Sequence, residues 1–271
     1  MTPPPGADVA APTILVFDSG LGGLTVHRAV AQARPDARYV YAADDAFFPY
    51  GAHGEAELSA RLVALMGELI GAHRPDLVVI ACNTASTLVL PQLRARYSVP
   101  FVGTVPAIKP ACAASRSKRV SVLGTQATVG REYTRALIRD FANGADVTLV
   151  GSARLAGLAE ADLRGEEVGD AAIAQELAPC FVDAGGRRTD TIVLACTHYP
   201  LLLPRLQQLA PWPVAFVDPA PAIARRVVEL IGPAQAGGAP PARVVFTSGR
   251  APSPALARAL AGYGLGAAER N

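Results

Sequence analysis

Lysine is nearly missing from this sequence. Among 271 residues only Lys109 and Lys118 occur, so arginine carries almost all of the positive charge. Pyridoxal phosphate is held on enzymes as a Schiff base with a lysine, and neither of these lysines sits in a glycine-rich segment that could also bind its phosphate. We therefore expect that any chemistry performed by the chain needs no cofactor.

Cysteine is scarce as well. The four cysteines, Cys82, Cys112, Cys180 and Cys196, are widely and irregularly spaced and form no C-x-x-C pair. This spacing fits neither a disulfide framework nor a zinc site, so we expect no bound metal. Thiols without such partners are typical of a reducing compartment, which predicts a cytoplasmic protein.

Long apolar runs and an excess of charge of one sign are also absent. The strongest apolar runs, at 77–81 and 192–195, are far shorter than the roughly 20 residues that cross a bilayer, and the first residues lack the regions of a signal peptide. With 25 basic and 23 acidic residues the formal charge is +2, which favours neither nucleic acid nor an anionic membrane. We expect a small-molecule ligand, with no nucleic-acid or membrane partner.

Short β-branched runs alternate with helical patterns along the chain. Between Glu55 and His73 apolar residues recur at helical spacing, which predicts an amphipathic helix. The predicted strands are 13–17, 38–42, 77–81, 101–105, 120–124, 147–150, 191–195, 214–217 and 243–246, and further helices are predicted after residues 23, 84, 130, 200 and 219. This alternation indicates an α/β protein with parallel sheets covered by helices on both faces.

One sequence pattern occurs twice. LVVIACNTAS at 77–86 resembles TIVLACTHYP at 191–200, since in both an apolar strand is followed by Ala-Cys, small polar residues and a helix. A fainter pair, ILVFDSGLGGLTV at 14–26 and VSVLGTQATV at 120–129, precedes them. The chain is therefore predicted to contain two similar halves, each with a thiol at the carboxyl end of a strand.

Three motifs follow predicted strands, where parallel sheets bind ligands. Residues 18–23 (DSGLGG) form a glycine-rich turn without the dinucleotide or Walker pattern, and its glycines are predicted to bring the backbone close to a ligand. Residues 82–84 (CNT) and 196–198 (CTH) place thiols beside polar groups that can hold a carboxylate. A thiol at a helix N-terminus or beside His198 ionises more readily.

Two thiols facing one pocket suggest that a proton is removed from one face of a carbon and delivered to the other. This arrangement suits racemisation. An amino-acid α-hydrogen is a very weak acid, whereas an ordinary thiol has a pKa of about 8.5, so the site must also stabilise a carbanionic transition state with preorganised donors and exclude water. A hydrolase or amidase with one cysteine nucleophile and His198 as base is an alternative from another class, but it leaves the second thiol unexplained.

The chain resembles the glutamate racemases, within the aspartate/glutamate racemase superfamily. The resemblance rests on FDSGLGGLTV, PYG at 49–51, ACNTAS at 81–86, GTVPAIKPA at 103–111, LGTQATV at 123–129 and ACTHYPLL at 195–202, in this order. It implies cofactor-independent interconversion of L- and D-glutamate, D-glutamate being supplied to peptidoglycan synthesis, and a homodimer. It also implies two pseudo-symmetric α/β domains with the active site in the cleft between them: 1–105 completed by 218–271, and 106–217.

The resemblance also implies roles for individual residues. Cys82 and Cys196 look like the catalytic acid/bases for D- and L-glutamate, assisted by Asp18 and His198 respectively, and Glu160 falls where the family often has an acid near the second thiol. The implied substrate contacts are Asp18, Ser19, Tyr50, Gly51, Asn83, Thr84, Thr125, Thr197 and His198. Because no conspicuous basic residue is among them, backbone N–H groups and hydroxyls are expected to hold the carboxylates.

The sequence departs from the family pattern at three places, of which Ala195, where a Gly normally precedes the second cysteine, is a minor change. Asp44-Asp45-Ala46-Phe47 replaces an Asp-Thr-Ala-Arg-like run before PYG, and Ser152-Ala153 stands where a Cys-Pro pair is common. These changes leave the thiol pair intact but bear on side-chain specificity. A sibling racemase that acts on aspartate, another amino acid or a hydantoin is therefore a second hypothesis beside glutamate.

Overall fold

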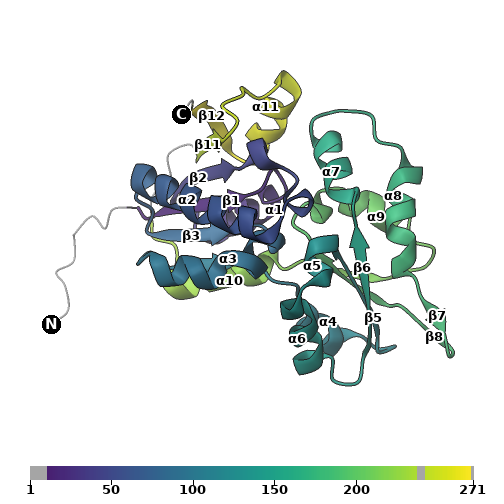
Figure 1. Cartoon of the computed structure of the whole chain (residues 1–271). Helices are drawn as coiled ribbons and strands as arrows, with labels where there is room; N and C mark the ends of the chain where they lie inside the picture. The colour runs from purple at the N-terminus through teal and green to yellow at the C-terminus, as the bar shows by residue number, and fades with distance from the viewer. Residues whose placement is uncertain (1–10, 237–241, 270–271) are drawn as a thin grey trace.

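The computed structural model describes residues 11–236 and 242–269, so the first residues, on which the signal-peptide prediction rests, lie outside the described part. The described chain forms two lobes that lie side by side (Figure 1). The first lobe contains the purple and yellow parts of the chain, and the second lobe contains most of the teal and green parts.

The first lobe is built on a six-stranded parallel sheet in the order β12-β11-β2-β1-β3-β4. Its strands are β1 (Thr13–Asp18), β2 (Arg38–Ala43), β3 (Leu77–Ile80), β4 (Phe101–Gly103), β11 (Ala242–Phe246) and β12 (Leu265–Glu269). Its α-helices are α1 (Leu24–Ala33), α2 (Glu55–His73), α3 (Asn83–Arg96), α10 (Ala220–Ile231) and α11 (Pro254–Ala261), and the short 3-10 turns η1 (Asp45–Phe47) and η2 (Tyr50–Ala52) follow β2.

Each central strand of this sheet is buried on both faces. In β1, Ile14 and Val16 pack in the core that includes residues of α1 and α10, whereas Leu15 and Phe17 pack in the core that includes residues of α2 and α3. Side chains of a strand alternate between the two faces, so a strand covered on both sides must be apolar throughout. This explains why the strand sequences are continuous apolar runs.

The second lobe is built on a four-stranded parallel sheet in the order β10-β9-β5-β6. Its strands are β5 (Arg119–Thr125), β6 (Asp146–Ser152), β9 (Thr191–Ala195) and β10 (Ala215–Val217), with a small hairpin of β7 (Asp183–Ala184) and β8 (Arg187–Arg188). Its helices are α4 (Ile108–Ala114), α5 (Gln126–Gly130), α6 (Glu132–Phe141), α7 (Leu155–Leu163), α8 (Asp170–Leu177) and α9 (Leu203–Gln208), with 3-10 turns η3 (Ala178–Cys180) and η4 (Tyr199–Leu202).

The chain passes between the lobes twice, between β4 and α4 and between β10 and α10. The strands that follow the second passage, β11 and β12, complete the sheet of the first lobe. These passages support the division into 1–105 with 218–271 and 106–217, which we retain as a proposal for the domain bounds.

The predicted α/β class with parallel sheets is confirmed. Every predicted strand is present with ends within two residues of the prediction, and the helix at Glu55–His73 has the predicted bounds. The short strands β7 and β8, the strand β12 and the helices α4, α5, α7, α8 and α11 were not predicted. The repeated pattern also has a structural counterpart, because β1 pairs with β3 in the first lobe as β5 pairs with β9 in the second.

Candidate active site

A small enclosed cavity of about 30 Å³ lies between the two lobes. It is lined by Ser19, Phe48, Pro49, Tyr50, Gly51, Cys82, Asn83, Thr84, Thr125, Ala156, Cys196, Thr197 and His198. All of the predicted site residues are therefore in the lining except Asp18 and Glu160, which lie behind it. Phe48, Pro49 and Ala156 were not predicted.

The paired strands explain why these residues meet. Asp18 ends β1 and Cys82 follows β3 in the first lobe, while Thr125 ends β5 and Cys196 follows β9 in the second. The carboxyl ends of parallel strands in one sheet share one edge. The cavity lies where these two edges face each other.

Cys82 is buried directly before α3. Its Sγ donates to Ser19 Oγ over 3.7 Å. Burial raises the pKa of the Cys82 thiol to about 12, and the nearby charges of Asp18 and Cys196 act in the same direction. Cys82 is therefore a protonated thiol at neutral pH in the closed site.

Asp18 is fully buried and holds the turn that follows β1. Its Oδ2 accepts hydrogen bonds from the backbone N–H groups of Gly23, at 2.9 Å, and Gly20, at 3.3 Å. Burial raises the pKa of the Asp18 carboxyl, although the charge of His198 opposes this. Within the described chain Ser19, and not Asp18, is the side chain hydrogen-bonded to Cys82.

Cys196 belongs to a chain of three side chains. His198 Nδ1 lies 3.8 Å from Cys196 Sγ, and His198 Nε2 lies 3.0 Å from Glu160 Oε1. Burial lowers the pKa of His198, but its bonds to Cys196 and Glu160 outweigh this and raise the pKa well above the ordinary value. His198 is therefore an imidazolium whose Nδ1–H can stabilise a thiolate at Cys196.

Glu160, on α7, is the partner of that imidazolium. Burial raises the pKa of its carboxyl, but hydrogen bonds from His198, Arg164 and Leu21 N outweigh burial and lower the pKa to about 2. Glu160 is thus ionised at neutral pH. The two thiols therefore have different surroundings: a neutral hydroxyl beside Cys82, and an imidazolium–carboxylate pair beside Cys196.

Several buried polar atoms at the site have no partner within the described chain. They are both amide atoms of Asn83 and Oδ1 of Asp18. Buried polar groups in folded proteins almost always form hydrogen bonds, so these atoms indicate a polar ligand. The hydroxyl of Thr84, 3.2 Å from that of Thr125, adds a polar contact between the lobes.

The site loop, residues 44–52, is held by Asp44. The buried Asp44 carboxylate accepts bonds from Tyr50 Oη at 2.7 Å, from Nε and a terminal nitrogen of Arg61, and from Thr247 Oγ1 at 2.7 Å. Tyr50 therefore contributes its ring to the cavity, while its hydroxyl is used by Asp44. The loop is fixed from α2 and from the end of β11.

Arg61 also contacts the apolar part of this loop. Its guanidinium lies 4.6 Å from the centre of the Phe47 ring. Position 47, where the resemblance leads us to expect an arginine, is Phe47 here, and Arg61 reaches Asp44 from α2. Sequence reasoning missed this arrangement because the contact depends on how α2 lies against the loop and not on a local pattern.

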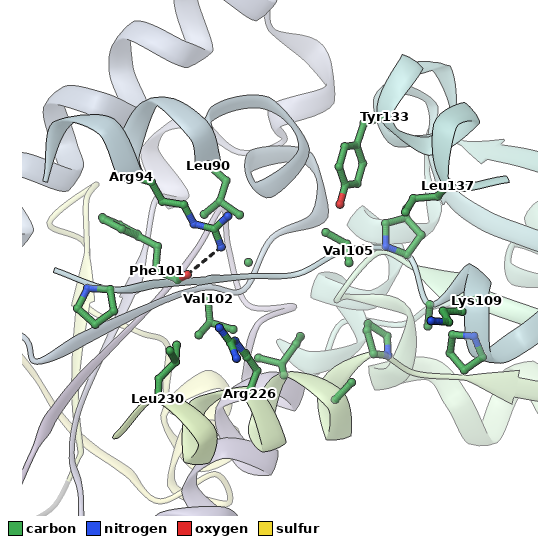
Figure 2. Close-up of a pocket in the computed structure, with 18 of the residues that line it drawn as sticks. Leu90, Arg94, Phe101, Val102, Val105, Lys109, Tyr133, Leu137, Arg226 and Leu230 are labelled. Atoms are coloured by element: carbon green, nitrogen blue, oxygen red, sulfur yellow. Dashed lines mark hydrogen bonds between the residues drawn. The ribbon is translucent and has the colours of Figure 1, made fainter. Parts of the chain in front are cut away.

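A second, larger cavity of about 960 Å³ lies where the chain passes between the lobes (Figure 2). Its lining includes Arg94 and Arg226 of the first lobe and Lys109 and Tyr133 of the second, and it includes no acidic residue. Arg94 donates to the carbonyl of Phe101 over 3.0 Å. Arg226 is paired with Glu229 over 2.8 Å, so the net positive charge of this partly apolar surface comes from Arg94 and Lys109.

Both lysines lie away from the thiols. Lys109 Nζ is 5.2 Å from the centre of the Phe141 ring, and Lys118 Nζ donates to the carbonyl of Cys112 over 3.1 Å. Neither is among the residues that line the small cavity. A lysine Schiff base therefore has no anchor there.

Comparison with known proteins identifies similar sequences and structures. The family model for Asp/Glu/hydantoin racemases matches residues 24–227. A curated glutamate racemase from Brucella anthropi is 53% identical over 264 residues, covering 96% of this chain and 95% of the relative. One from Brucella ovis is 52% identical over 280 residues, covering 97% of this chain and 98% of the relative.

Solved structures agree with this similarity. Escherichia coli glutamate racemase, described in complex with L-glutamate and the activator UDP-MurNAc-ala, has a TM-score of 0.87 at 40% identity, with 95% of this chain and 97% of that chain covered. Glutamate racemase from Thermus thermophilus has a TM-score of 0.71 at 30% identity, with 98% of each chain covered. Among the described residues no helix is both long and apolar enough to span a membrane.

Proposed function

This chain belongs to the Asp/Glu/hydantoin racemase family, and from that premise we propose that it interconverts L- and D-glutamate with Cys82 and Cys196 as opposed acid/bases. The observation that carries this proposal is the cavity that both thiols line at equivalent strand ends of the two lobes. The names of its curated relatives support glutamate over aspartate or a hydantoin. A single-nucleophile hydrolase is not favoured, because it has no use for the second thiol.

In the direction from L- to D-glutamate, Cys196 is the base. The His198 imidazolium stabilises its thiolate, which takes the α-proton of L-glutamate and leaves the electron pair of the C–H bond on the α-carbon. Cys82, a thiol because burial raises its pKa to about 12, then gives its proton to the opposite face of that carbon. The protonation states of the two thiols are exchanged after the step, and the reverse reaction uses them in those exchanged states.

The lining groups provide the electrostatic part of the mechanism. The amide of Asn83 and the hydroxyls of Thr84, Thr125 and Thr197 can hold the substrate carboxylates as developing negative charge spreads onto them. Ser19 supports Cys82 by its hydrogen bond. Asp18 acts from behind the lining, through its charge and through the turn that it holds.

The test is incubation of the purified protein with L-glutamate in D2O without an added cofactor, with α-proton exchange followed by NMR and inversion by optical rotation. Exchange and inversion are both expected, and both must be much slower with L-aspartate. A correctly folded sample that shows neither with glutamate would falsify the proposal, and faster inversion of aspartate would change the substrate.

Variants of the two thiols test the mechanism itself. Cys82→Ser and Cys196→Ser should each lower inversion by about 10³-fold or more, because each removes one acid/base from a two-base reaction. Cys82→Ser should still exchange the α-proton of L-glutamate, and Cys196→Ser that of D-glutamate. Wild-type turnover in either variant would eliminate the two-thiol mechanism.

We also propose that the larger cavity in Figure 2 takes an anionic activator. The similar E. coli enzyme is described with the activator UDP-MurNAc-ala, whose diphosphate would suit the cations Arg94, Lys109 and Arg226. A ligand between the lobes can also bias their spacing at the active site. UDP-MurNAc-ala is expected to raise kcat or lower KM of the wild type. The double variant Lys109→Ala/Arg226→Ala should show no such activation. If the double variant is still activated, the activator binds elsewhere.

Three further properties follow from the resemblance and are proposed on it. The enzyme is expected to work in the cytoplasm, to supply D-glutamate to peptidoglycan synthesis, and to form a homodimer. The four free cysteines of the described chain suit a reducing compartment. Light scattering coupled to size-exclusion chromatography distinguishes the dimer from the monomer.

A further inference from the structure

The glycine-rich turn after β1 lies against the other lobe. A Cβ added to Gly20 would be 2.0 Å from Glu160 Oε1, and one added to Gly22 would be 2.3 Å from His198 Nδ1. Both glycines have ordinary backbone conformations, outside the left-handed region that favours glycine. Space, and not backbone geometry, therefore excludes a side chain at these two positions.

This finding changes the interpretation of the turn. The sequence predicted that its glycines bring the backbone close to a ligand. In the structure Gly20 and Gly22 make room for two side chains of the second lobe. Gly23 differs, because a Cβ there would meet Ala81 and Asp18 of its own lobe.

A hydrogen bond joins the same partners. Leu21 N donates to Glu160 Oε1 over 2.8 Å, and the same oxygen lies 3.0 Å from His198 Nε2. Arg164 holds Oε2 at 2.9 Å. The first lobe thus supplies one of the donors that orient the Glu160 carboxylate, and that carboxylate orients the imidazole beside Cys196.

The cleft must open for substrate to enter. A water molecule needs about 10–15 Å³ of such space, so a cavity of about 30 Å³ has room for about two waters and not for glutamate. When the lobes separate, the bond from Leu21 and the contacts of Gly20 and Gly22 are lost. The arrangement around His198 is then no longer fixed from the first lobe.

We propose that the turn Gly20-Leu21-Gly22 is a positioning element for the second thiol, which aligns Glu160 and His198 with Cys196 only when the cleft is closed. The proposal rests on the two-thiol racemase function. It makes the base that acts on L-glutamate dependent on closure. Cys82 has no such dependence on closure, because its hydrogen-bond partner Ser19 belongs to the same lobe as Cys82.

The test compares Gly20→Ala with Gly71→Ala, a control in α2 where an added Cβ has no neighbour within 4 Å. A displacement of about 1 Å at a reacting group costs about 10²-fold in rate. We therefore expect Gly20→Ala to lower inversion and α-proton exchange of L-glutamate by about 10²-fold. The fold-loss in α-proton exchange of D-glutamate should be at least ten times smaller, that is about 10-fold or less. Gly71→Ala should match the wild type.

A compensating variant separates positioning from general damage to the fold. Glu160→Asp shortens the side chain that an alanine at position 20 would meet, so the double variant Gly20→Ala/Glu160→Asp should be faster on L-glutamate than Gly20→Ala alone. The proposal is overturned if Gly20→Ala lowers the rate of L-glutamate inversion by less than threefold, or if it lowers α-proton exchange of both enantiomers equally. It is also overturned if the effects of Gly20→Ala and Glu160→Asp on this rate simply multiply in the double variant. Because the wild type racemises glutamate in each of these outcomes, they leave the proposed function intact.

Discussion

Replacing Arg61 by methionine isolates the ion pair that holds the site loop. The Asp44 side chain is fully buried, whereas that of Arg61 is 31% exposed. Methionine keeps the unbranched stem of the side chain but removes both hydrogen bonds to the carboxylate. Asp44 keeps only its bonds from Tyr50 and Thr247.

The expected loss of stability follows from these contacts. Removing one partner of a buried ion pair costs about 3–5 kcal/mol, and the partial exposure of Arg61 places this pair at the lower end. We expect the free energy of unfolding to fall by about 3 kcal/mol. At about 2–4 °C per kcal/mol for a chain of this size, Tm should fall by about 6–12 °C.

The contribution of Asp44 to the free energy of unfolding should depend on pH. Burial raises the pKa of Asp44, but the bonds from Arg61, Thr247 and Tyr50 outweigh burial, so the pKa is lowered in the wild type. Asp44 therefore contributes stability above its ordinary pKa and loses it on acidification. In Arg61→Met burial is less opposed, Asp44 protonates at higher pH, and the difference from wild type should shrink as pH falls.

Urea unfolding of Arg61→Met, Asp44→Asn and the double variant measures the coupling directly. The double variant should be more stable than the sum of the single losses predicts, because no buried charge is left unpaired. Arg61→Lys should recover part of the loss. A decrease below about 1 kcal/mol in Arg61→Met, or additive losses, would refute the reasoning.

Two other changes have definite outcomes. Asn83→Ala should raise KM for glutamate by about 10-fold to 100-fold, because hydrogen bonds to a charged substrate are worth about 1.5–3 kcal/mol. It should leave Tm unchanged, since the amide atoms have no partner in the described chain. Steady-state kinetics measures KM and a thermal melt measures Tm, and an unchanged KM contradicts a binding role. Glu160 has its pKa lowered to about 2 from an ordinary 4.5, so its stabilising contribution is complete above about pH 4.5 and is lost toward pH 2. Glu160→Gln should therefore show a shallower loss of stability over this range in urea melts, and an unchanged slope contradicts the assignment.

Sequence reasoning recovered most of the fold because the strands are buried on both faces. Such strands are continuous apolar runs, and several end at Gly or polar residues, as β1 does at Asp18 and β4 at Gly103. The missed elements lack this signal. The strands β7 and β8 have two residues each, β12 is Leu-Gly-Ala-Ala-Glu, and α4 contains Pro110 in only seven residues.

The thiols were found because they occur in a repeated motif at the ends of strands, and local sequence determines that placement. The supports of the site depend on tertiary structure. Thr247 reaches Asp44 from a position 203 residues away, and Glu160 reaches Leu21 from 139 residues away. No local pattern records such pairs, which is why the role of Gly20 and Gly22 became apparent only from the folded chain.

The strands β11 and β12 return to the first sheet at the end of the chain, and this determines the order in which the two lobes can fold during synthesis. The strand β2 pairs with β11, and their partners Ala43 and Phe246 are about 200 residues apart. At about 5–20 residues per second, synthesis leaves that edge of β2 without its partner for about 10–40 s. The second lobe is a continuous segment and can fold cotranslationally during this time, whereas the nascent first lobe exposes an unpaired strand edge that can pair with other chains.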